Sequence, residues 1–263
     1  MGKKLDLDKY YTPKDLAEYC YNKVIELIGK ENITEIIEPS AGSGVFLDID
    51  NSIKGYDISP DDDRIIQADY LELDLEYKVG RLILGNPPYG RCLNLAQKFY
   101  KKSVLICDYI AFILPISQLN TNRTFYEFDL IYSEDLGLKK YSGVNLHCVF
   151  NIYKRPILGL NNKPKDVLRD IEIIRQDHKN YNNIDFDVRM CYWGNGTAGK
   201  ILKDDEHYAA EYKIIIHNEG YKKEIKDFIE CFDWNGYLTG IAMKRLKQFH
   251  IIDVLKERFD FLK

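Results

Sequence analysis

The chain lacks several features that would assign it to a specialised class. No apolar stretch approaches the roughly 18 residues that span a bilayer, and the first residues, MGKKLDLDKYY, contain no apolar signal core. The six cysteines are scattered without a CxxC pair, and the five histidines show no metal spacing. These absences argue against a zinc site and a disulfide scaffold. They predict a protein of the reducing cytoplasm that uses neither a membrane nor a metal.

A strong excess of charge of either sign is also missing. The net charge is −4 over 263 residues, with 45% hydrophobic and 30% charged residues, as in ordinary globular proteins. Residues 1–150 carry 17 basic and 23 acidic residues, whereas residues 151–263 carry 20 and 18. A basic face that meets nucleic acid is therefore expected to be local, and to use the second half of the chain.

The strongest positive signal is the tetrapeptide Asn86-Pro87-Pro88-Tyr89, which follows the apolar run 82–85. Two consecutive prolines bar a helix and push the preceding residues toward extended geometry. The result is a stiff elbow just past a buried strand, which presents an amide, a backbone carbonyl and a flat ring. Such an elbow suits a planar substrate with an NH2 group, above all the exocyclic amine of adenine. The alternative is a proline-rich turn with an asparagine bonded to its own backbone.

Alternating apolar runs and amphipathic segments predict an α/β sheet. Thr12 is expected to cap a helix that begins with Pro13, and a second helix is expected over 93–103. The connections 44–52 and 57–64 are too short for ordinary crossover helices, so the sheet should have trimmed helices on its faces. Strands are expected at 34–38, 52–57, 64–67, 81–85, 107–114, 129–132 and 144–153.

A domain boundary is predicted near residue 158, where the polar stretch GLNNKPKD begins. It separates a first domain, 1–158, from a small mixed α+β region, 159–263. In that region strands are expected over 186–193, near Lys200 and over 212–217. Helices are expected from about residue 222 to the end.

The turn over residues 38–44 follows a predicted strand and predicts a site for a nucleotide-like ligand, since glycine allows a close approach of the backbone. It is not GxGxxG, so a dinucleotide is disfavoured. It opens with Glu38, whose carboxylate would repel phosphate but suits an ammonium or sulfonium group. Asp57, after the second strand, stands where a ribose-binding acid belongs, and Asp69, after the third, could accept from an adenine amine.

The succession of motifs then resembles a known family. Tyr11-Thr12-Pro13 is followed by EPSAGSG at 38–44, GYDIS at 55–59, QADYLELD at 67–74 and LILGNPPYG at 82–90. This order is similar to that of amino-group S-adenosylmethionine-dependent DNA methyltransferases, in the adenine-N6 group whose cofactor region precedes the catalytic motif. The resemblance covers roughly residues 10–155. It implies a Rossmann-like seven-stranded methyltransferase sheet, followed by a target-recognition region.

The resemblance also implies an activity and its residues. The expected reaction transfers a methyl group from S-adenosylmethionine to N6 of an adenine flipped out of double-stranded DNA, as in a site-specific adenine DNA-methyltransferase. RNA adenine, a protein glutamine amide and an inactive cofactor-binding subunit remain alternatives, and a restriction nuclease partner cannot be read from the sequence. Asn86, Pro87 and Tyr89 would be catalytic, with Tyr141 as a second stacking aromatic. Cofactor contacts are expected from Tyr11, Thr12, Glu38, Ser40, Ala41, Gly42, Gly44, Asp57, Ile58, Asp69, Tyr70 and Asn86.

Three features of the second half leave two readings each. The stretch GNGTAGK at 194–200 nearly fits a phosphate-binding P-loop, but Ile201 replaces the required hydroxyl residue, so we expect a glycine-rich loop between strands. Its alternative is a loop near the DNA backbone with Lys200 on a phosphate. Tyr192-Trp193 either packs in the core or stacks on bases. The basic cluster 244–247 either contacts phosphate or forms a solvated helix face.

Overall fold

The computed structural model describes residues 11–141, 143–177, 179, 184–203, 206, 210–239 and 243–263. Their contacts divide the chain into two compact units, Met1–Pro164 and Lys165–Lys263. The division falls a few residues after the boundary that the polar stretch predicts.

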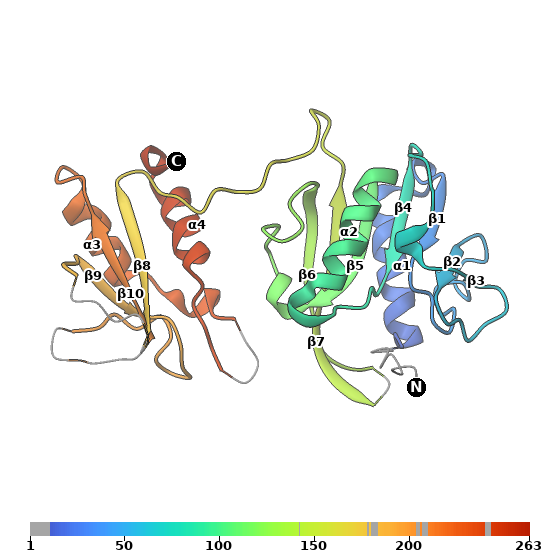
Figure 1. The fold of residues 1–263 in the computed structure, drawn as a ribbon, viewed down its shortest axis with the longest axis horizontal. Helices are drawn as coiled ribbons and strands as arrows, with labels where there is room; N and C mark the ends of the chain where they lie inside the picture. The colour runs from blue at the N-terminus through green and yellow to red at the C-terminus, as the bar shows by residue number, and fades with distance from the viewer. Residues whose placement is uncertain are drawn as a thin grey trace. The chain divides into compact units, whose positions relative to one another are not determined.

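Unit 1 is built on a seven-stranded sheet of order β3-β2-β1-β4-β5-β7-β6 (Figure 1). Its first five strands in this order are parallel, and β7 runs antiparallel between β5 and β6. This is the Rossmann-like seven-stranded sheet that the resemblance implies. The strands are β1 Glu35–Glu38, β2 Lys54–Asp57, β3 Ile66–Gln67, β4 Arg81–Gly85, β5 Tyr109–Pro115, β6 Asp129–Tyr141 and β7 Val144–Lys154.

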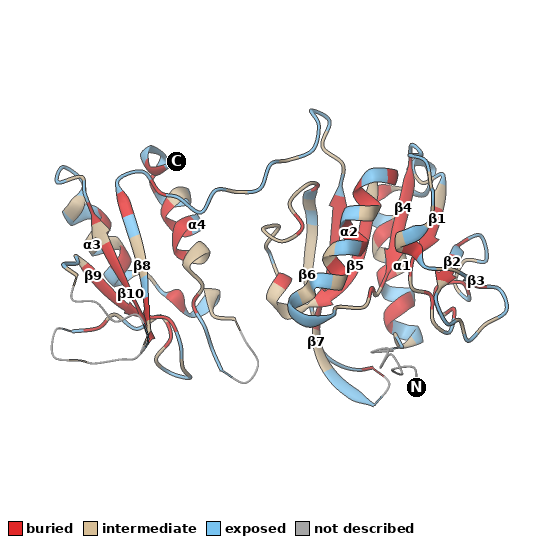
Figure 2. Ribbon diagram, in the orientation of Figure 1, coloured by how far each residue is buried: buried red, intermediate tan, exposed pale blue. Residues whose placement is uncertain are grey.

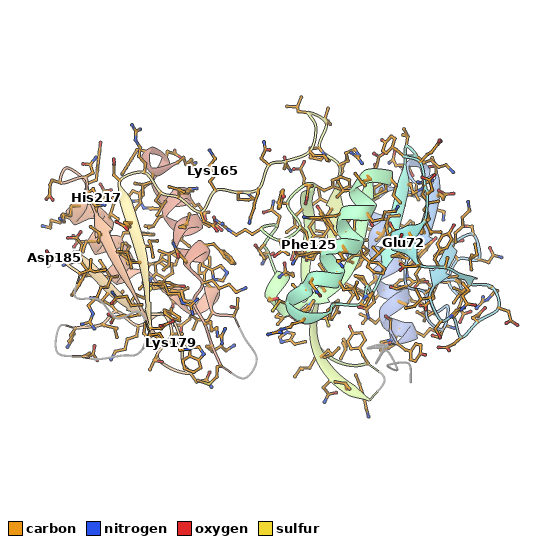
Figure 3. The ribbon with its side chains drawn as sticks, in the orientation of Figure 1. Glu72, Phe125, Lys165, Lys179, Asp185 and His217 are labelled. Carbon is orange, nitrogen blue, oxygen red and sulfur yellow. The ribbon has the colours of Figure 1, made fainter. Side chains whose placement is uncertain are left out.

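Helices α1 (Lys14–Ile28) and α2 (Asn94–Ile106) cover opposite faces of this sheet. Because side chains alternate along a strand, Leu82 and Leu84 of β4 pack in the cluster that holds α1, whereas Ile83 packs in the cluster that holds α2. Figure 2 shows the central strands buried throughout. Phe125, labelled in Figure 3, belongs to the cluster on the α2 side.

The connections between β1 and β2 and between β2 and β3 contain turns and no α-helix, as their lengths predict. Short 3-10 helices serve as connectors elsewhere in both units. They span Lys30–Asn32, Tyr70–Glu72, Arg91–Leu93, Ile116–Gln118, Trp234–Tyr237 and Asp260–Leu262.

Two local predictions in unit 1 are wrong. The expected strand 129–132 continues to Tyr141, because it pairs with β7 through two bulges in one long hairpin. The residue that precedes α1 is Pro13, and Thr12 makes no capping hydrogen bond. The Thr12 hydroxyl instead accepts from the side chain of Asn86, across the carboxyl edge of the sheet.

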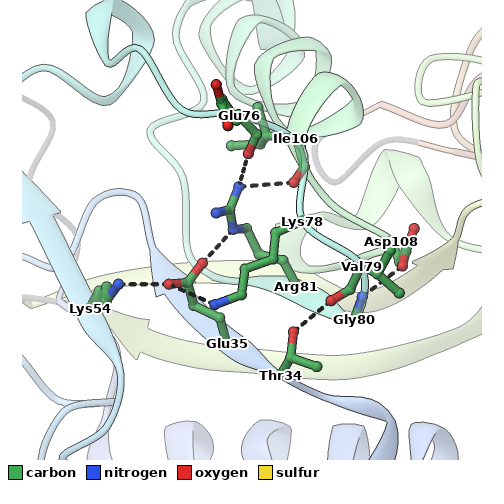
Figure 4. A network of polar contacts seen from close by, with 10 residues as sticks. All are labelled: Thr34, Glu35, Lys54, Glu76, Lys78, Val79, Gly80, Arg81, Ile106 and Asp108. Atoms are coloured by element: carbon green, nitrogen blue, oxygen red, sulfur yellow. Dashed lines mark hydrogen bonds and ion pairs between the residues drawn. The ribbon is translucent and has the colours of Figure 1, made fainter.

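The opposite, amino edge of the sheet is tied by a network centred on Glu35 (Figure 4). Arg81 Nε donates to Glu35 Oε2 at 2.5 Å, and Lys54 Nζ donates to Glu35 Oε1 at 2.6 Å. Arg81 also donates to the carbonyl of Ile106 at 3.0 Å. Burial alone would raise the pKa of Glu35, but the hydrogen bonds from Lys54 and Arg81 outweigh it and lower the pKa to about 2.

The described residues of unit 2 form a three-stranded antiparallel sheet of order β8-β10-β9 and two α-helices. Its apolar core joins β10 residues such as Tyr212 and Ile214 to Ile225 of the first helix and Ile251 of the second. The first strand was not predicted, and the strand expected near Lys200 is reduced to a single bridge at Ile201. The elements are β8 Ile171–Asp177, β9 Val188–Cys191, β10 Ala210–Ile216, α3 Lys222–Cys231 and α4 Gln248–Arg258.

Candidate active site

A cavity of about 410 Å³ opens at the carboxyl ends of β1, β2 and β4. The order of the strands reverses between β1 and β4, and this is where parallel α/β sheets bind ligands. Every residue that the sequence singles out for the cofactor or the chemistry lines the cavity, except Gly44 and Tyr141. Those residues are Tyr11, Thr12, Glu38, Ser40, Ala41, Gly42, Asp57, Ile58, Asp69, Tyr70, Asn86, Pro87 and Tyr89.

The turn after β1 is held against the end of β2. The backbone N–H of Gly42 donates to Asp57 Oδ2 at 2.9 Å, and the N–H of Ser59 donates to Asp57 Oδ1 at 2.8 Å. Gly42 has φ +51°, and a Cβ built there would lie 3.2 Å from the ring of Tyr11. A larger residue would therefore strain the turn. Both oxygens of Asp57 retain lone pairs that can accept from hydroxyl groups.

Gly44 lies outside the cavity lining, contrary to the expected cofactor contact. Its N–H donates to the carbonyl of Ala41 at 2.7 Å, and its φ of +77° closes the turn. This glycine serves the shape of the loop.

Glu38 is the most unusual group in the cavity. Its side chain ends the buried strand β1, the residue is 3% exposed, and Oε2 has no hydrogen-bond partner among the described residues. Burial raises the pKa of Glu38 well above its usual range, and the charge of Asp57 raises it further. A buried carboxyl group without a partner is costly, so the site calls for a cationic or N–H donor from a ligand.

The far part of the cavity is less polar. Asp69 caps a short 3-10 helix, since the N–H of Leu71 donates to Asp69 Oδ1 at 2.9 Å. The Tyr70 hydroxyl hydrogen-bonds to the Ser103 hydroxyl at 2.8 Å, and Ser103 does not line the cavity. Sequence reasoning missed other lining residues from this turn and from α2. They are Leu71 of the 3-10 helix and Leu95 and Phe99 of α2, and Val45 after the β1 turn was missed as well.

The elbow after β4 is fixed from two sides. Asn86 Nδ2 donates to Thr12 Oγ1 at 3.3 Å, and the Ser40 hydroxyl donates to the main-chain carbonyl of Asn86 at 3.1 Å. The Tyr89 hydroxyl donates to Asn86 Oδ1 at 3.0 Å. Residues far apart in the sequence thus orient one amide side chain toward the cavity that also holds Glu38.

Tyr141 does not join this group. It is fully buried in the cluster on the α1 side and does not line the cavity, so the prediction that it stacks on a substrate base is wrong. Its neighbour Cys148 lies 3.5 Å from the Tyr89 hydroxyl, measured to the sulfur. Tyr141 therefore contacts the elbow indirectly, through Cys148.

Sequence comparison finds relatives for part of the chain, although no family model matches it. Over 144 residues it is 30% identical to the Type II methyltransferase M.HincII of Haemophilus influenzae, which covers 45% of this chain and 26% of the relative. The relatives of this chain are methyltransferases. A second, M.CvrRI of Paramecium bursaria Chlorella virus XZ-6E, is a Type II methyltransferase that is 25% identical over 189 residues, covering 56% and 48%. The chain thus matches less than half the length of each relative.

Solved methyltransferase structures show a weaker likeness. A type I restriction-modification methyltransferase subunit of Streptococcus thermophilus aligns with a TM-score of 0.44 at 12% identity, over 94% of this chain and 57% of that chain. A candidate RNA methyltransferase from Pyrococcus horikoshii aligns with a TM-score of 0.47 at 15% identity, over 59% and 91%.

The donor and acceptor set of the cavity fits S-adenosylmethionine as the cofactor. Glu38 offers the unpartnered carboxylate that an ammonium group needs, and Asp57 offers acceptors for ribose hydroxyls. Within the described residues, no group of three or more histidine, cysteine or acidic side chains could hold a metal ion. In the same residues, no helix is both long enough and apolar enough to cross a membrane.

Proposed function

We propose that the chain methylates the N6 amine of an adenine that is flipped out of double-stranded DNA, with S-adenosylmethionine as the methyl donor. The observation that carries this proposal is the shared cavity. Asn86, an acceptor suited to an amine, lines the same space as Glu38 and Asp57, acceptors suited to the cofactor. The succession of motifs from Tyr11 to Tyr89 and the Type II relatives support DNA as the substrate.

The cofactor would be held by groups from three strand ends. Glu38 would pair with its ammonium group, Asp57 would accept from the ribose hydroxyls, and Asp69 would accept from the adenine amine through its second oxygen. Thr12 and the backbone of residues 41–43 would complete the contact with the methionine part. The bound cofactor supplies a methyl group made electrophilic by its sulfonium charge.

The elbow would prepare the substrate amine. In free adenine the N6 lone pair is delocalised into the ring and is a poor nucleophile. Asn86 Oδ1 and the main-chain carbonyl of Pro87 would each accept one amine hydrogen, which draws the nitrogen toward tetrahedral geometry and localises its lone pair. These two fixed acceptors would also stabilise the positive charge that grows on nitrogen as the methyl–sulfur bond breaks; S-adenosylhomocysteine leaves with the bonding electron pair, and the methylated amine loses one proton to solvent. The ring of Tyr89 would stack on the base, which must leave the duplex to enter the cavity.

An RNA adenine or a protein glutamine amide offers the same planar NH2 group, so the substrate class is tested directly. Purified chain is supplied with tritiated S-adenosylmethionine and, in parallel, duplex DNA, RNA and protein. We expect label in DNA, at N6-methyladenine after digestion, and none with Asn86→Ala. Label confined to RNA or protein would replace DNA as substrate. Cofactor binding without any transfer would identify an inactive subunit.

A further inference from the structure

Three features of unit 2 that are separate in the sequence meet at one place in the structure. The N–H of Gly194 donates to the carbonyl of Lys244 at 3.0 Å, and the N–H of Lys244 donates to Asn195 Oδ1 at 3.0 Å. Trp193 and Arg245 form an isolated antiparallel bridge. The aromatic pair after β9, the glycine-rich turn and the basic segment before α4 therefore form one structural feature.

The glycine-rich turn itself is not a phosphate cradle. The N–H groups of Thr197, Ala198, Gly199 and Lys200 all donate to backbone carbonyls within the turn or to Cys191. A P-loop needs such groups free to face its ligand. The Lys200 side chain hydrogen-bonds to Glu206, so its charge is already balanced. The turn is the glycine-rich loop that the sequence predicts, and its hydrogen bonds to Lys244 hold the basic segment beside Trp193.

Those neighbours form what we call the Trp193 surface, which consists of Trp193, Met243, Lys244, Arg245 and Lys247. Trp193 is 42% exposed, Lys244 and Arg245 are exposed, and the Arg245 guanidinium lies 6.0 Å from the centroid of the Trp193 ring. No described acidic side chain forms an ion pair with any of the three cations, in contrast to Lys222 and Lys226 on α3.

The electrostatics of Lys247 agree with an excess of basic side chains at this surface. Burial lowers the pKa of Lys247, and the charge of Arg245 lowers it further, with no acidic group acting in the other direction. An uncompensated cluster of cations around an exposed aromatic ring combines phosphate contacts with stacking or apolar contact to sugars and bases. The basic balance of the second half of the sequence agrees with this placement.

We propose that the Trp193 surface binds the sugar-phosphate backbone of duplex DNA, with Lys244, Arg245 and Lys247 facing phosphates and the Trp193 ring covering the sugar or base beside them. The choice of DNA rests on the proposed function, and charge complementarity supports a polyanion. Backbone contacts position a protein on its site without reading sequence, so this surface would set affinity for all DNA alike.

The test measures binding of the full-length chain to a fluorescent duplex by anisotropy, without cofactor, over a series of salt concentrations. Each phosphate contact contributes close to one unit to the slope of log K against log salt. The double variant Lys244→Gln/Arg245→Gln should lower the magnitude of that slope by about 2 and weaken binding to unrelated duplexes equally. The control Lys223→Gln/Lys226→Gln removes two charges from α3 and should keep the wild-type slope.

Trp193→Ala should weaken binding about tenfold with little change in slope, since a neutral ring is lost, and Trp193→Phe should restore most of the affinity. An unchanged slope in the double variant, or an equal fall in the control variant, would overturn the proposal. So would binding of RNA, but not DNA, through the same residues.

The outcome is separable from that of the proposed function. If the variants lose DNA binding while the wild-type chain transfers no methyl group, the DNA-binding role of the Trp193 surface is supported and the proposed methyl transfer is refuted. If the double variant methylates DNA and binds it with wild-type affinity, the proposed methyl transfer is supported and the DNA-binding role of the Trp193 surface is refuted.

Discussion

In Glu38, the proposed function and the stability of the fold make opposite demands on one side chain. It is buried without a partner for Oε2, which is unfavourable in the folded chain alone. Because its pKa is raised, the folded chain holds the proton more tightly than the unfolded chain does. Its contribution to stability is therefore complete below the ordinary value of 4.5 and is lost as pH rises toward the raised pKa.

Replacing this carboxyl group should raise the stability of the fold and lower the affinity for the cofactor. Glu38→Gln removes the titration, so the variant without cofactor should gain about 1–3 kcal/mol in free energy of unfolding at neutral pH. It should also lose about 10- to 100-fold in affinity for S-adenosylmethionine, because the charged hydrogen bond is gone. Thermal melts with and without cofactor measure both effects. A destabilised variant with normal cofactor affinity would contradict this account.

Asn86 is expected to act mainly on the substrate, although it also lines the cofactor cavity. Asn86→Ala removes one of the two amine acceptors and should abolish methyl transfer, while cofactor affinity changes less than threefold. Single-turnover transfer and calorimetric titration with S-adenosylmethionine separate the two readouts. Normal turnover in this variant would show that Asn86 does not hold the substrate amine.

Tyr89 contributes a ring and a hydroxyl, and the structure gives the hydroxyl a bond to Asn86 Oδ1 at 3.0 Å. Tyr89→Ala should lower kcat/KM by about 30- to 700-fold, because stacking on the extruded base is worth ~1–3 kcal/mol and the lost hydrogen bond to Asn86 about 1 kcal/mol more. Tyr89→Phe keeps the ring and loses one neutral hydrogen bond, worth about 1 kcal/mol, so the loss should stay below about tenfold. Equal losses in both variants would show that the hydroxyl, and not stacking, is essential.

At the scale of elements, the amino ends of β1 and β4 are joined by the pair Glu35 and Arg81, in which both side chains are 9% exposed. Glu35→Gln leaves the Arg81 charge partly buried without its partner, and should cost about 3 kcal/mol in free energy of unfolding near neutral pH. The lowered pKa of Glu35 means that this stabilisation is present above 4.5 and fades as pH falls toward 2. Urea titrations at pH 7 and pH 3 should therefore show a smaller difference between variant and wild type at pH 3. A constant difference would contradict the linkage.

The sequence predicted the elements whose signals are local. β4 was predicted at its observed bounds because Leu82, Ile83 and Leu84 form a continuous apolar run that the prolines end. β8 was missed because its exposed residues interrupt its apolar ones, and it is defined by pairing with β10, far along the chain. The same reason explains β6, whose second half exists through its pairing with β7.

The candidate site was predictable to a similar degree. Motif spacing placed Glu38, Asp57 and Asn86 at three strand ends, and the topology brings those ends to one cavity. The inner position of Tyr141 was not predictable, since it depends on which face of β6 the bulges turn toward α1. Nor was the turn of the Thr12 hydroxyl toward Asn86, which requires the folded sheet.

At the scale of the whole molecule, the link between the units carries the two most exposed large apolar side chains of the described residues. Ile157 is 97% exposed and Leu158 is 100% exposed, and residues 157–164 lie in no helix or strand. Limited digestion with chymotrypsin should therefore cut first after Leu158. The fragment 1–158 should keep its affinity for S-adenosylmethionine, because every described residue that lines the cavity precedes the cut. Binding to duplex DNA should fall. First cleavage elsewhere, or loss of cofactor binding on cleavage, would contradict the independence of the units.

The strand β1 is only four residues long, and it has a glutamate at each end. Glu35 at its start is paired with cations, whereas Oε2 of Glu38 at its end has no partner among the described residues. The ion pairs that stabilise the fold therefore lie at one end of the strand and the proposed cofactor contact lies at the other, about 10 Å away at the usual rise per residue. A laboratory selection for heat tolerance can alter the surroundings of the first tip without touching the second. This short strand thereby leaves the chain free to adapt to a new temperature while its chemistry stays the same.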